Sequence, residues 1–234
     1  MLASRRMAIE HSTLARTLSL AVHELRTPVT VVNGYLRMVL KGQAGPLSEK
    51  QQKMLEEAER SCERIGALVA QMSDVGKLET GELTLTRQDI DLTGLLAEVA
   101  SDMPEGVDRG VHVEVRGTHQ PRIVAGDRVR LAAAVRALLY VALRERAVPG
   151  VVIVDCSVVA DPEPSVVIAV GDEDTVRSLA HSSSSASPFD EWRGGVGLAL
   201  PLARRIITAH GGSVWSAAGE SRKGSAIRLP LKTT

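Results

Sequence analysis

Three side chains suited to group-transfer chemistry stand close together near the start of the chain. They are His23, Glu24 and Thr27, within the run Ala-Val-His-Glu-Leu-Arg-Thr-Pro at residues 21–28. A neutral imidazole is a nucleophile, a neighbouring carboxylate can orient it and take its proton, and a hydroxyl can position water. A helix turns about 100° per residue, so Thr27 lies one turn after His23 on the same flank, with Glu24 beside them. The spacing makes His23 a candidate nucleophile for group transfer; the alternative is an ordinary solvated or packed histidine.

A stripe of apolar residues runs past His23 with alternating spacings of four and three, which is typical of a coiled-coil or helical-bundle seam. His23 is one position off this seam, so its imidazole should face outward. We expect the first helix to run from Ser4 to Lys41. The seam residues are Leu14, Leu18, Val22, Leu25, Val29, Val32, Leu36 and Val39.

A second helix should follow a break of glycine and proline at residues 42–47. Ser48 with Gln51 resembles a capping box, which marks a helix start. One hairpin cannot bury the seams of both helices, so a second copy should complete a four-helix bundle, and we expect a homodimer through residues 4–80. The apolar positions of the second helix are Met54, Ala58, Cys62, Ile65, Val69, Met72 and Val75.

From Glu82 onward the pattern changes to short strands interleaved with helices, which predicts a second domain that is an α+β two-layer sandwich rather than a doubly wound fold. The expected domains are therefore residues 1–80 and 81–234. A serine tract at residues 180–187 should be mobile. The expected strands are 83–85, 111–115, 123–124, 151–159, 166–170, 213–217 and 225–231, and the expected helices are 92–103, 127–146 and 196–210.

Charge and composition narrow the classes of partner. Lysine and arginine total 28, aspartate and glutamate total 28, and aromatic residues make up 2 %, which argues against nucleic acid and anionic membranes. The longest apolar stretch, Leu131–Leu143, contains Arg136 and is too short to span a bilayer, and no signal peptide precedes it, so we expect a cytoplasmic location. Cys62 and Cys156 fit buried thiols better than a disulfide, and the histidines show no metal spacing.

The run His-Glu-Leu-Arg-Thr-Pro resembles the phosphoacceptor box of bacterial sensor histidine kinases, whose core joins a dimeric phosphotransfer hairpin to an ATP-binding domain. The resemblance implies that His23 takes a phosphoryl group and passes it to an aspartate on the receiver domain of a response regulator. It also implies that Glu24 accepts the proton of the imidazole and that Thr27 positions water for a phosphatase reaction. Pro28 should bend the helix just after these residues. No sensor segment is recognisable in this sequence, so the signal could come from a separate sensor protein or kinase, or from a further segment of the same protein.

The later part of the chain resembles the ATP-binding module of the same family. The run Gly-Gly-Val-Gly-Leu-Ala-Leu at residues 194–200 resembles the second glycine box, which implies nucleotide contacts by Gly195, Gly197 and Leu198. Glycines leave backbone amides open at a helix start, where they and the helix dipole attract phosphate; an ordinary helix start is the alternative. Phe189 resembles the aromatic anchor of the lid, or is simply packed.

One helix of that module departs from the family pattern. The family carries Asn-Leu-Leu-x-Asn-Ala, and its second asparagine helps to hold the Mg²⁺ of ATP; this chain has Ala-Leu-Leu-Tyr-Val-Ala at residues 137–142. Val141 supplies no oxygen ligand for magnesium. Arg144 stands at a basic position of the family and could meet phosphate, although a solvated helix face is the stronger interpretation. Glu145, one turn beyond Val141, is a minor candidate for a replacement ligand.

The first glycine box is also changed. Where the family has Asp-x-Gly-x-Gly, this chain has Asp-Glu-Asp-Thr-Val at residues 172–176. The aspartate that reads adenine could therefore survive as Asp172, while both glycines are lost. Asp172 could equally be a turn residue at the end of a strand. Glu173 and Asp174 would bring negative charge near a triphosphate. ATP and Mg²⁺ are therefore implied by the resemblance, and their binding is expected to be impaired or lost.

Three functions remain for such a chain. An autokinase needs nucleotide and Mg²⁺, whereas an ATP-independent phosphotransferase or response-regulator phosphatase needs only His23, its flank and a regulator. A dimeric scaffold needs neither. The intact run at residues 21–28 argues against the scaffold, because a seam alone suffices for dimerisation. Val141 and the missing glycines argue against the autokinase.

Overall fold

The computed structural model describes residues 2–103, 109–146, 148–160, 163–180, 188–217 and 223–232, and side chains from residue 18 onward. The chain divides into two compact units, Met1–Leu83 and Thr84–Thr234. The first is helical and the second is built on a sheet, which confirms the predicted fold class. The serine tract at 181–187 lies outside the described residues.

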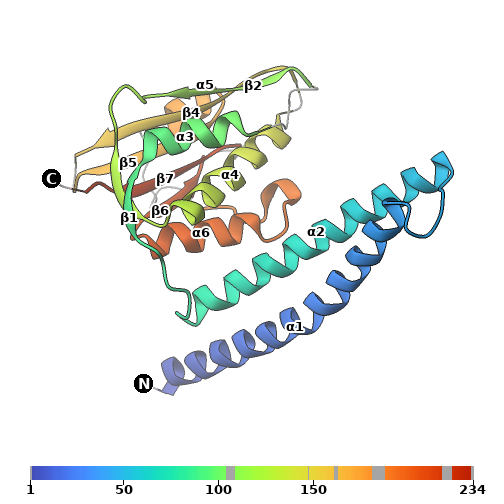
Figure 1. Ribbon diagram of the computed structural model, residues 1–234. Coiled ribbons are helices and arrows are strands. Elements are labelled where there is room, and N and C mark those ends of the chain that lie inside the picture. Colours follow the sequence, from blue (N-terminus) through green and yellow to red (C-terminus); the bar gives the residue numbers. More distant parts are fainter. Residues whose placement is uncertain are drawn as a thin grey trace. The chain divides into compact units, whose positions relative to one another are not determined.

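The first unit is a hairpin of two long antiparallel helices, α1 (Leu2–Leu40) and α2 (Glu49–Glu79) (Figure 1). The predicted capping box starts α2: the backbone N–H of Gln51 donates to Ser48 Oγ at 3.4 Å, and the N–H of Ser48 donates to Gln51 Oε1 at 2.9 Å. These bonds satisfy backbone donors that the first helical turn leaves open. Two positive-φ glycines, Gly42 and Gly45, lie in the loop between the helices.

The apolar seam of the hairpin is only partly covered within one chain. Val22, Cys62 and Val69 are buried between the two helices. Other apolar side chains of the same helices stay exposed, among them two seam residues of α1, Leu25 and Val32. The exposed set comprises Leu20, Leu25, Val31, Val32, Tyr35, Met38, Met54, Ile65 and Leu68. One hairpin therefore leaves a large apolar surface without a partner.

The second unit is built on a five-stranded mixed sheet with the order β2-β4-β5-β7-β6. The β2–β4 pair is parallel and the other pairs are antiparallel. Three helices cover one face of this sheet (Figure 1), and β1 and β3 form a separate antiparallel pair. The strands are β1 (Gln88–Asp91), β2 (Val111–Arg116), β3 (Ile123–Gly126), β4 (Gly150–Val159), β5 (Ser165–Gly171), β6 (Ser213–Ser216) and β7 (Ser225–Pro230); the covering helices are α3 (Leu92–Ser101), α4 (Arg128–Glu145) and α6 (Ala199–Ala209).

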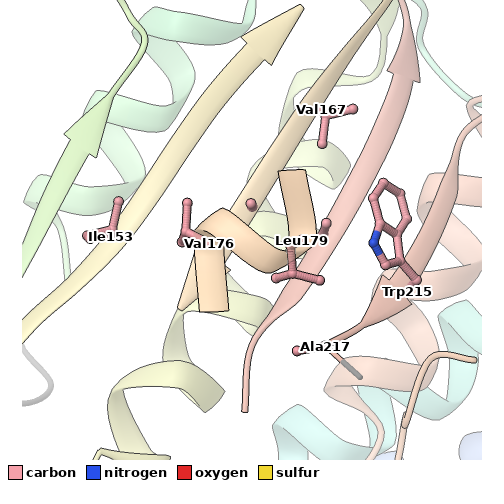
Figure 2. Packing of buried hydrophobic residues seen from close by; sticks show 8 residues of the cluster. Ile153, Val167, Val176, Leu179, Trp215 and Ala217 are labelled. Atoms are coloured by element: carbon pink, nitrogen blue, oxygen red, sulfur yellow. The ribbon is translucent and has the colours of Figure 1, made fainter. Parts of the chain in front are cut away.

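Both faces of the sheet are buried at its centre. Every residue of β5 is buried. Because successive side chains of a strand point to opposite faces, both faces of the sheet must be covered at this strand. On one face Val167 and Ala169 pack with Val176 and Leu179 of a short helix, α5 (Glu173–Ala180), and with Trp215 (Figure 2). This helix adds cover on the second face, which the two-layer expectation did not include.

One local expectation is wrong and one helix was not expected. The segment 83–85 is not a strand; the first strand begins at Gln88, and the N–H of Leu83 donates to the carbonyl of Lys77 at 3.1 Å, in the last turn of α2. Helix α5, which begins at Glu173, was not among the expected helices. The side chain of Asp172 accepts a hydrogen bond from the N–H of Thr175 at 3.0 Å, which is helix capping.

Both cysteines are free and buried. Cys62 donates a weak hydrogen bond from Sγ to the carbonyl of Val29 at 3.4 Å, which links the two helices of the hairpin. Burial raises the pKa of the Cys156 thiol to about 11. The two thiols lie in different units and behave as packing residues, as the sequence predicts.

His210 fastens the end of α6 to the start of α4. The ring is buried, with Nδ1 2.7 Å from the carbonyl oxygen of Ile206, and Nε2 accepts a hydrogen bond from the backbone N–H of Asp127 at 2.9 Å. One ring nitrogen must therefore donate while the other accepts, which requires the neutral imidazole. Burial lowers the pKa of His210 accordingly.

Acid should weaken the second unit through His210. Its pKa is lower in the folded chain than the value of about 6.5 for an unfolded histidine, so the unfolded chain binds more protons as the pH falls. The stabilisation is complete above about pH 6.5 and is lost as the pH falls from there through the depressed pKa. Urea unfolding across this window should show a falling midpoint.

The matched variants for this prediction are His210→Gln and His112→Gln, the second at an exposed position on β2. The midpoint of the His210 variant should depend less on pH than that of the unchanged chain, because glutamine has no proton to gain. The His112 variant should keep the full dependence. Equal slopes in all three chains would contradict the assignment to His210.

Candidate functional site

His23 stands out from the surface of α1. Its side chain is 79 % exposed, and that of Glu24 is 72 % exposed. His23 Nδ1 lies 3.8 Å from Glu24 Oε1, so the carboxylate faces one ring nitrogen and leaves Nε2 open to a docking partner. Thr27 is exposed one turn further along the helix. The structure thus brings together the three residues that the sequence singled out, in the outward position that the seam predicted.

The local sequence explains why the imidazole is presented in this way. Val22, immediately before His23, is buried in the hairpin and fixes the rotation of α1 at this point. Pro28 lies inside α1 and has no N–H, so the carbonyl of Glu24 lacks its usual helical donor. The helix nevertheless continues to Leu40. The candidate histidine is therefore carried by a helix that Val22 anchors in the hairpin directly beside it.

A cavity of about 290 Å³ lies in the second unit, at the ends of α4 and β5. Asp172 and Glu145, both considered from the sequence, line it. Arg146 and Lys223, which sequence reasoning missed, bring positive charge to it. Its remaining lining residues are Ala142, Val148, Val152, Gly171 and Gly224.

Glu145 is engaged by an arginine from another part of the chain. Arg193 Nη1 donates to Glu145 Oε2 at 2.8 Å, and Arg193 Nη2 donates to Ser225 Oγ. The arginine side chain is 6 % exposed and that of Glu145 is 19 % exposed. Burial raises the pKa of Glu145, and the charge of Arg193 opposes this increase. This pair is a feature that the sequence alone did not reveal.

Val141 lies in the core beside the second glycine box. It is 0 % exposed, and a Cβ added to Gly194 would lie 2.8 Å from Val141 Cγ1. Gly194 has φ +71°, within the short 3₁₀ turn η2 (Arg193–Gly195). The turn therefore packs directly on the valine, and a side chain at residue 194 would meet both a steric and a backbone penalty.

Other predicted contacts lie outside the cavity lining. Arg144 is exposed and its guanidinium lies 5.7 Å from the ring centre of Tyr140, which is the solvated arrangement favoured from the sequence. Gly195 and Gly197 have φ of +60° and +62°, and Leu198 is the N-cap of α6 without a side-chain hydrogen bond. The structure does not bring these four residues to the cavity with Asp172.

No group of three or more His, Cys, Asp or Glu side chains able to hold a metal ion occurs among the described residues. Within the same described part of the chain, no helix is both long and apolar enough to cross a membrane.

The chain is similar in sequence to known histidine kinases. The His Kinase A (phospho-acceptor) domain family matches residues 13–81, which includes His23. The cell-division control histidine kinase PdhS of Brucella suis is 28 % identical over 207 residues, covering 80 % of this chain and 20 % of PdhS. The sensor histidine kinase TrcS of Mycobacterium tuberculosis is 28 % identical over 221 residues, covering 90 % of this chain and 42 % of TrcS. The chain thus spans less than half the length of these relatives.

Solved structures show the same fold. Full-length ShkA in complex with AMPPNP superposes with a TM-score of 0.70 at 22 % identity, covering 94 % of this chain and 46 % of ShkA. The Acinetobacter baumannii histidine kinase AdeS gives a TM-score of 0.60 at 22 % identity, covering 90 % of this chain and 98 % of the AdeS chain. Residues 13–81 thus match the phospho-acceptor domain of histidine kinases, most of the chain is similar in sequence to histidine kinases, and its fold is that of these solved structures, a helical hairpin followed by an α/β sheet domain.

Proposed function

We propose that this chain exchanges phosphoryl groups between His23 and an aspartate of a response regulator, and that it does so without ATP. The observation that carries the proposal is the exposure of the His23 ring beside Glu24, on a hairpin matched to the phospho-acceptor family. An exposed imidazole on a rigid helix can be reached by a folded partner domain. The second unit supports the ATP-independent part, because its side chains do not fit Mg·ATP.

The fit to magnesium fails at α4. Magnesium requires oxygen ligands in near-octahedral geometry, and Val141 presents only methyl groups, which are packed against Gly194. Glu145, the replacement ligand considered from the sequence, is paired with Arg193 at 2.8 Å. A metal at this point would have to break a buried ion pair, which is costly because each charge loses its partner.

The fit to the nucleotide is no better at α5. Asp172 caps this helix, so the carboxylate oxygen that would read adenine already accepts the N–H of Thr175. The methyl group of Thr175 also lies close against two glycines: a Cβ built on Gly171 would be 2.7 Å away and one on Gly224 would be 2.3 Å away. ShkA was solved with AMPPNP, so a domain of this fold can hold a nucleotide; the proposal for this chain rests on its own side chains.

The transfer step uses the residues of α1. The lone pair of His23 Nε2 bonds to the phosphorus of the regulator's phosphoaspartate, and the bond from phosphorus to the aspartate oxygen breaks as the carboxylate leaves with its electron pair. The proton stays on Nδ1, where the Glu24 carboxylate at 3.8 Å stabilises the developing positive charge and can accept the proton. The reverse step returns the phosphoryl group to a regulator.

A phosphatase reaction is the second candidate, and the exposure of Thr27 favours it. The Thr27 hydroxyl lies one turn from His23 on the same helix, so it can orient a water molecule toward a phosphoaspartate docked at the imidazole. The water would attack phosphorus and release inorganic phosphate, with the aspartate as the leaving group. This reaction also needs no nucleotide.

The exposed apolar residues of the hairpin support a homodimer in both cases. Val31, Tyr35 and Met54 are all at least half exposed in the single chain. Packing a second hairpin against them would bury this surface and complete a four-helix bundle.

Phosphate labelling with two donors tests the proposal. The chain is incubated with γ-labelled Mg·ATP in one reaction and with a response regulator labelled on its aspartate in another, each beside His23→Ala. We expect label to pass from the regulator to His23, or to be released as phosphate, and no label to pass from ATP. Label from ATP on His23 would contradict ATP independence. An unchanged phosphoregulator would contradict both reactions and leave only a scaffold.

A further inference from the structure

We propose that Arg193 is an internal clasp that holds residues 190–198 (the 190–198 segment) on the second unit in the absence of any ligand. The clasp spans the place where α4, β7 and this segment meet. It goes beyond the phosphotransfer proposal, and it rests on the geometry of the second unit alone.

One buried guanidinium reaches two other segments of the second unit. Arg193 Nη1 bonds Glu145 of α4 at 2.8 Å, and Nη2 bonds the hydroxyl of Ser225, the first residue of β7. Glu145 is 48 positions from Arg193 in the sequence, and Ser225 is 32 positions away, so a single side chain ties three separate segments together. The planar fork of arginine suits this task, because its donors point in fixed and different directions.

Other contacts also hold the 190–198 segment against the second unit. The backbone N–H of Asp190 donates to Ser216 Oγ of β6 at 3.0 Å, and the Asp190 carboxylate accepts the N–H of Trp192 at 3.1 Å. Gly194 lies on Val141 of α4. The segment is therefore fastened before, at and after Arg193, with contacts to a strand and a helix of the same unit.

A further ionic contact links the segment to α6. Glu191 Oε2 lies 3.4 Å from Arg204 Nη1 and 4.0 Å from Arg205 Nη1. The arginines are partly exposed, so this contact contributes little compared with the buried pair. It adds a contact between the same segment and α6, the helix that follows it.

The consequence is a segment that needs no nucleotide to become ordered. Removing one member of a buried ion pair leaves the other charge buried and unpaired, whereas replacing both members removes the penalty. An anionic ligand would also have to compete with Glu145 for the guanidinium of Arg193. The clasp thus holds the unit in one arrangement and keeps the arginine from serving a phosphate group.

Hydrogen exchange of the full chain, without nucleotide, tests the clasp. Glu145→Gln and Arg193→Met should each raise the exchange rates of the amides in the 190–198 segment on the order of 100-fold, the size expected when a buried pair loses one partner. The double variant Glu145→Gln with Arg193→Met should recover most of the protection. Arg193→Lys keeps the charge but not the fork, so it should give an intermediate increase and guards against a simple failure to fold.

The matched control is Arg177→Met, which removes an exposed ion pair with Glu173 on α5 and should leave the exchange of the 190–198 segment unchanged. Unaltered exchange in both single variants would overturn the clasp, as would slower exchange of the segment when Mg·ATP is added to the unchanged chain. Failure of transfer at His23 would leave this exchange pattern untouched, so the two proposals can fail separately.

Discussion

Replacing His23 with glutamine is expected to reduce phosphoryl transfer from a phosphorylated regulator by at least about 10³-fold, because the nucleophile of the reaction is removed. Glutamine has no ring nitrogen to bond phosphorus, and its amide is a poor nucleophile. The position is exposed, so the fold and the oligomeric state should not change. The measurement is the amount of acid-labile phosphate on the chain after a timed reaction with the labelled regulator.

Two neighbouring variants sharpen this result. Glu24→Gln should slow transfer by about 10²-fold, because the carboxylate 3.8 Å from Nδ1 no longer stabilises the charged ring. Thr30→Ala is the matched control: its hydroxyl donates to the carbonyl of Arg26 at 2.8 Å, one turn along the same helix, and its loss should leave the rate unchanged. Full transfer by His23→Gln would mean that another residue accepts the phosphoryl group.

Replacing both Leu25 and Val32 with glutamate is expected to convert a dimer into monomers. These seam residues are 43 % and 51 % exposed in the single hairpin, and burying such a side chain contributes about 1.5–3 kcal/mol when its whole area is covered. Glutamates at these two positions would not provide this stabilisation. Their negative charges would also repel the same glutamates of the second copy across a two-fold axis. Sedimentation equilibrium measures the mass directly, and the helical signal should fall as well.

The control for the dimer is a charge placed on a polar surface of the same hairpin. Gln52→Glu lies at an exposed position of α2 and adds one negative charge without touching the apolar stripe, so the dimer should persist. A monomeric unchanged chain, or a glutamate double variant that stays dimeric, would contradict the four-helix arrangement.

The hairpin was predictable from sequence because its signals are local. Apolar spacing predicted both helices, and Ser48 with Gln51 predicted where α2 begins, since a capping box uses neighbouring backbone groups. Exposure of His23 followed from its place one position off the seam. The sheet strands β2, β3, β4 and β5 were likewise found from alternating or continuous apolar runs.

Two local features of the chain were missed because their sequence signals were weak or were compared with another pattern. The run at residues 172–176 was interpreted as an altered glycine box or as a turn at the end of a strand. Asp172 caps helix α5 at this point, and Val176 and Leu179 of this helix pack on the sheet. The strand predicted at residues 83–85 was wrong because two leucines at alternate positions are too short a signal, and hydrogen bonding to the end of α2 prevailed.

The Arg193–Glu145 pair of the candidate site was missed for another reason. Each residue alone reads as a solvated charge, and nothing local states that the two meet across 48 positions of sequence. The resemblance of residues 137–142 to the family pattern put Val141 at the position of the asparagine that helps to hold magnesium, and residue type alone showed that valine supplies no oxygen ligand. Sequence reasoning could not show that Gly194 packs on the valine.

The origin of the phosphoryl group on His23 is the most direct test of the account. A single reaction contains the chain, Mg·ATP labelled at the γ-phosphate with one phosphorus radioisotope, and a regulator labelled at its aspartate with another. The account predicts that the isotope recovered on His23, or released as inorganic phosphate in a His23- or Thr27-dependent way, comes from the regulator. The isotope of ATP on His23 would contradict it.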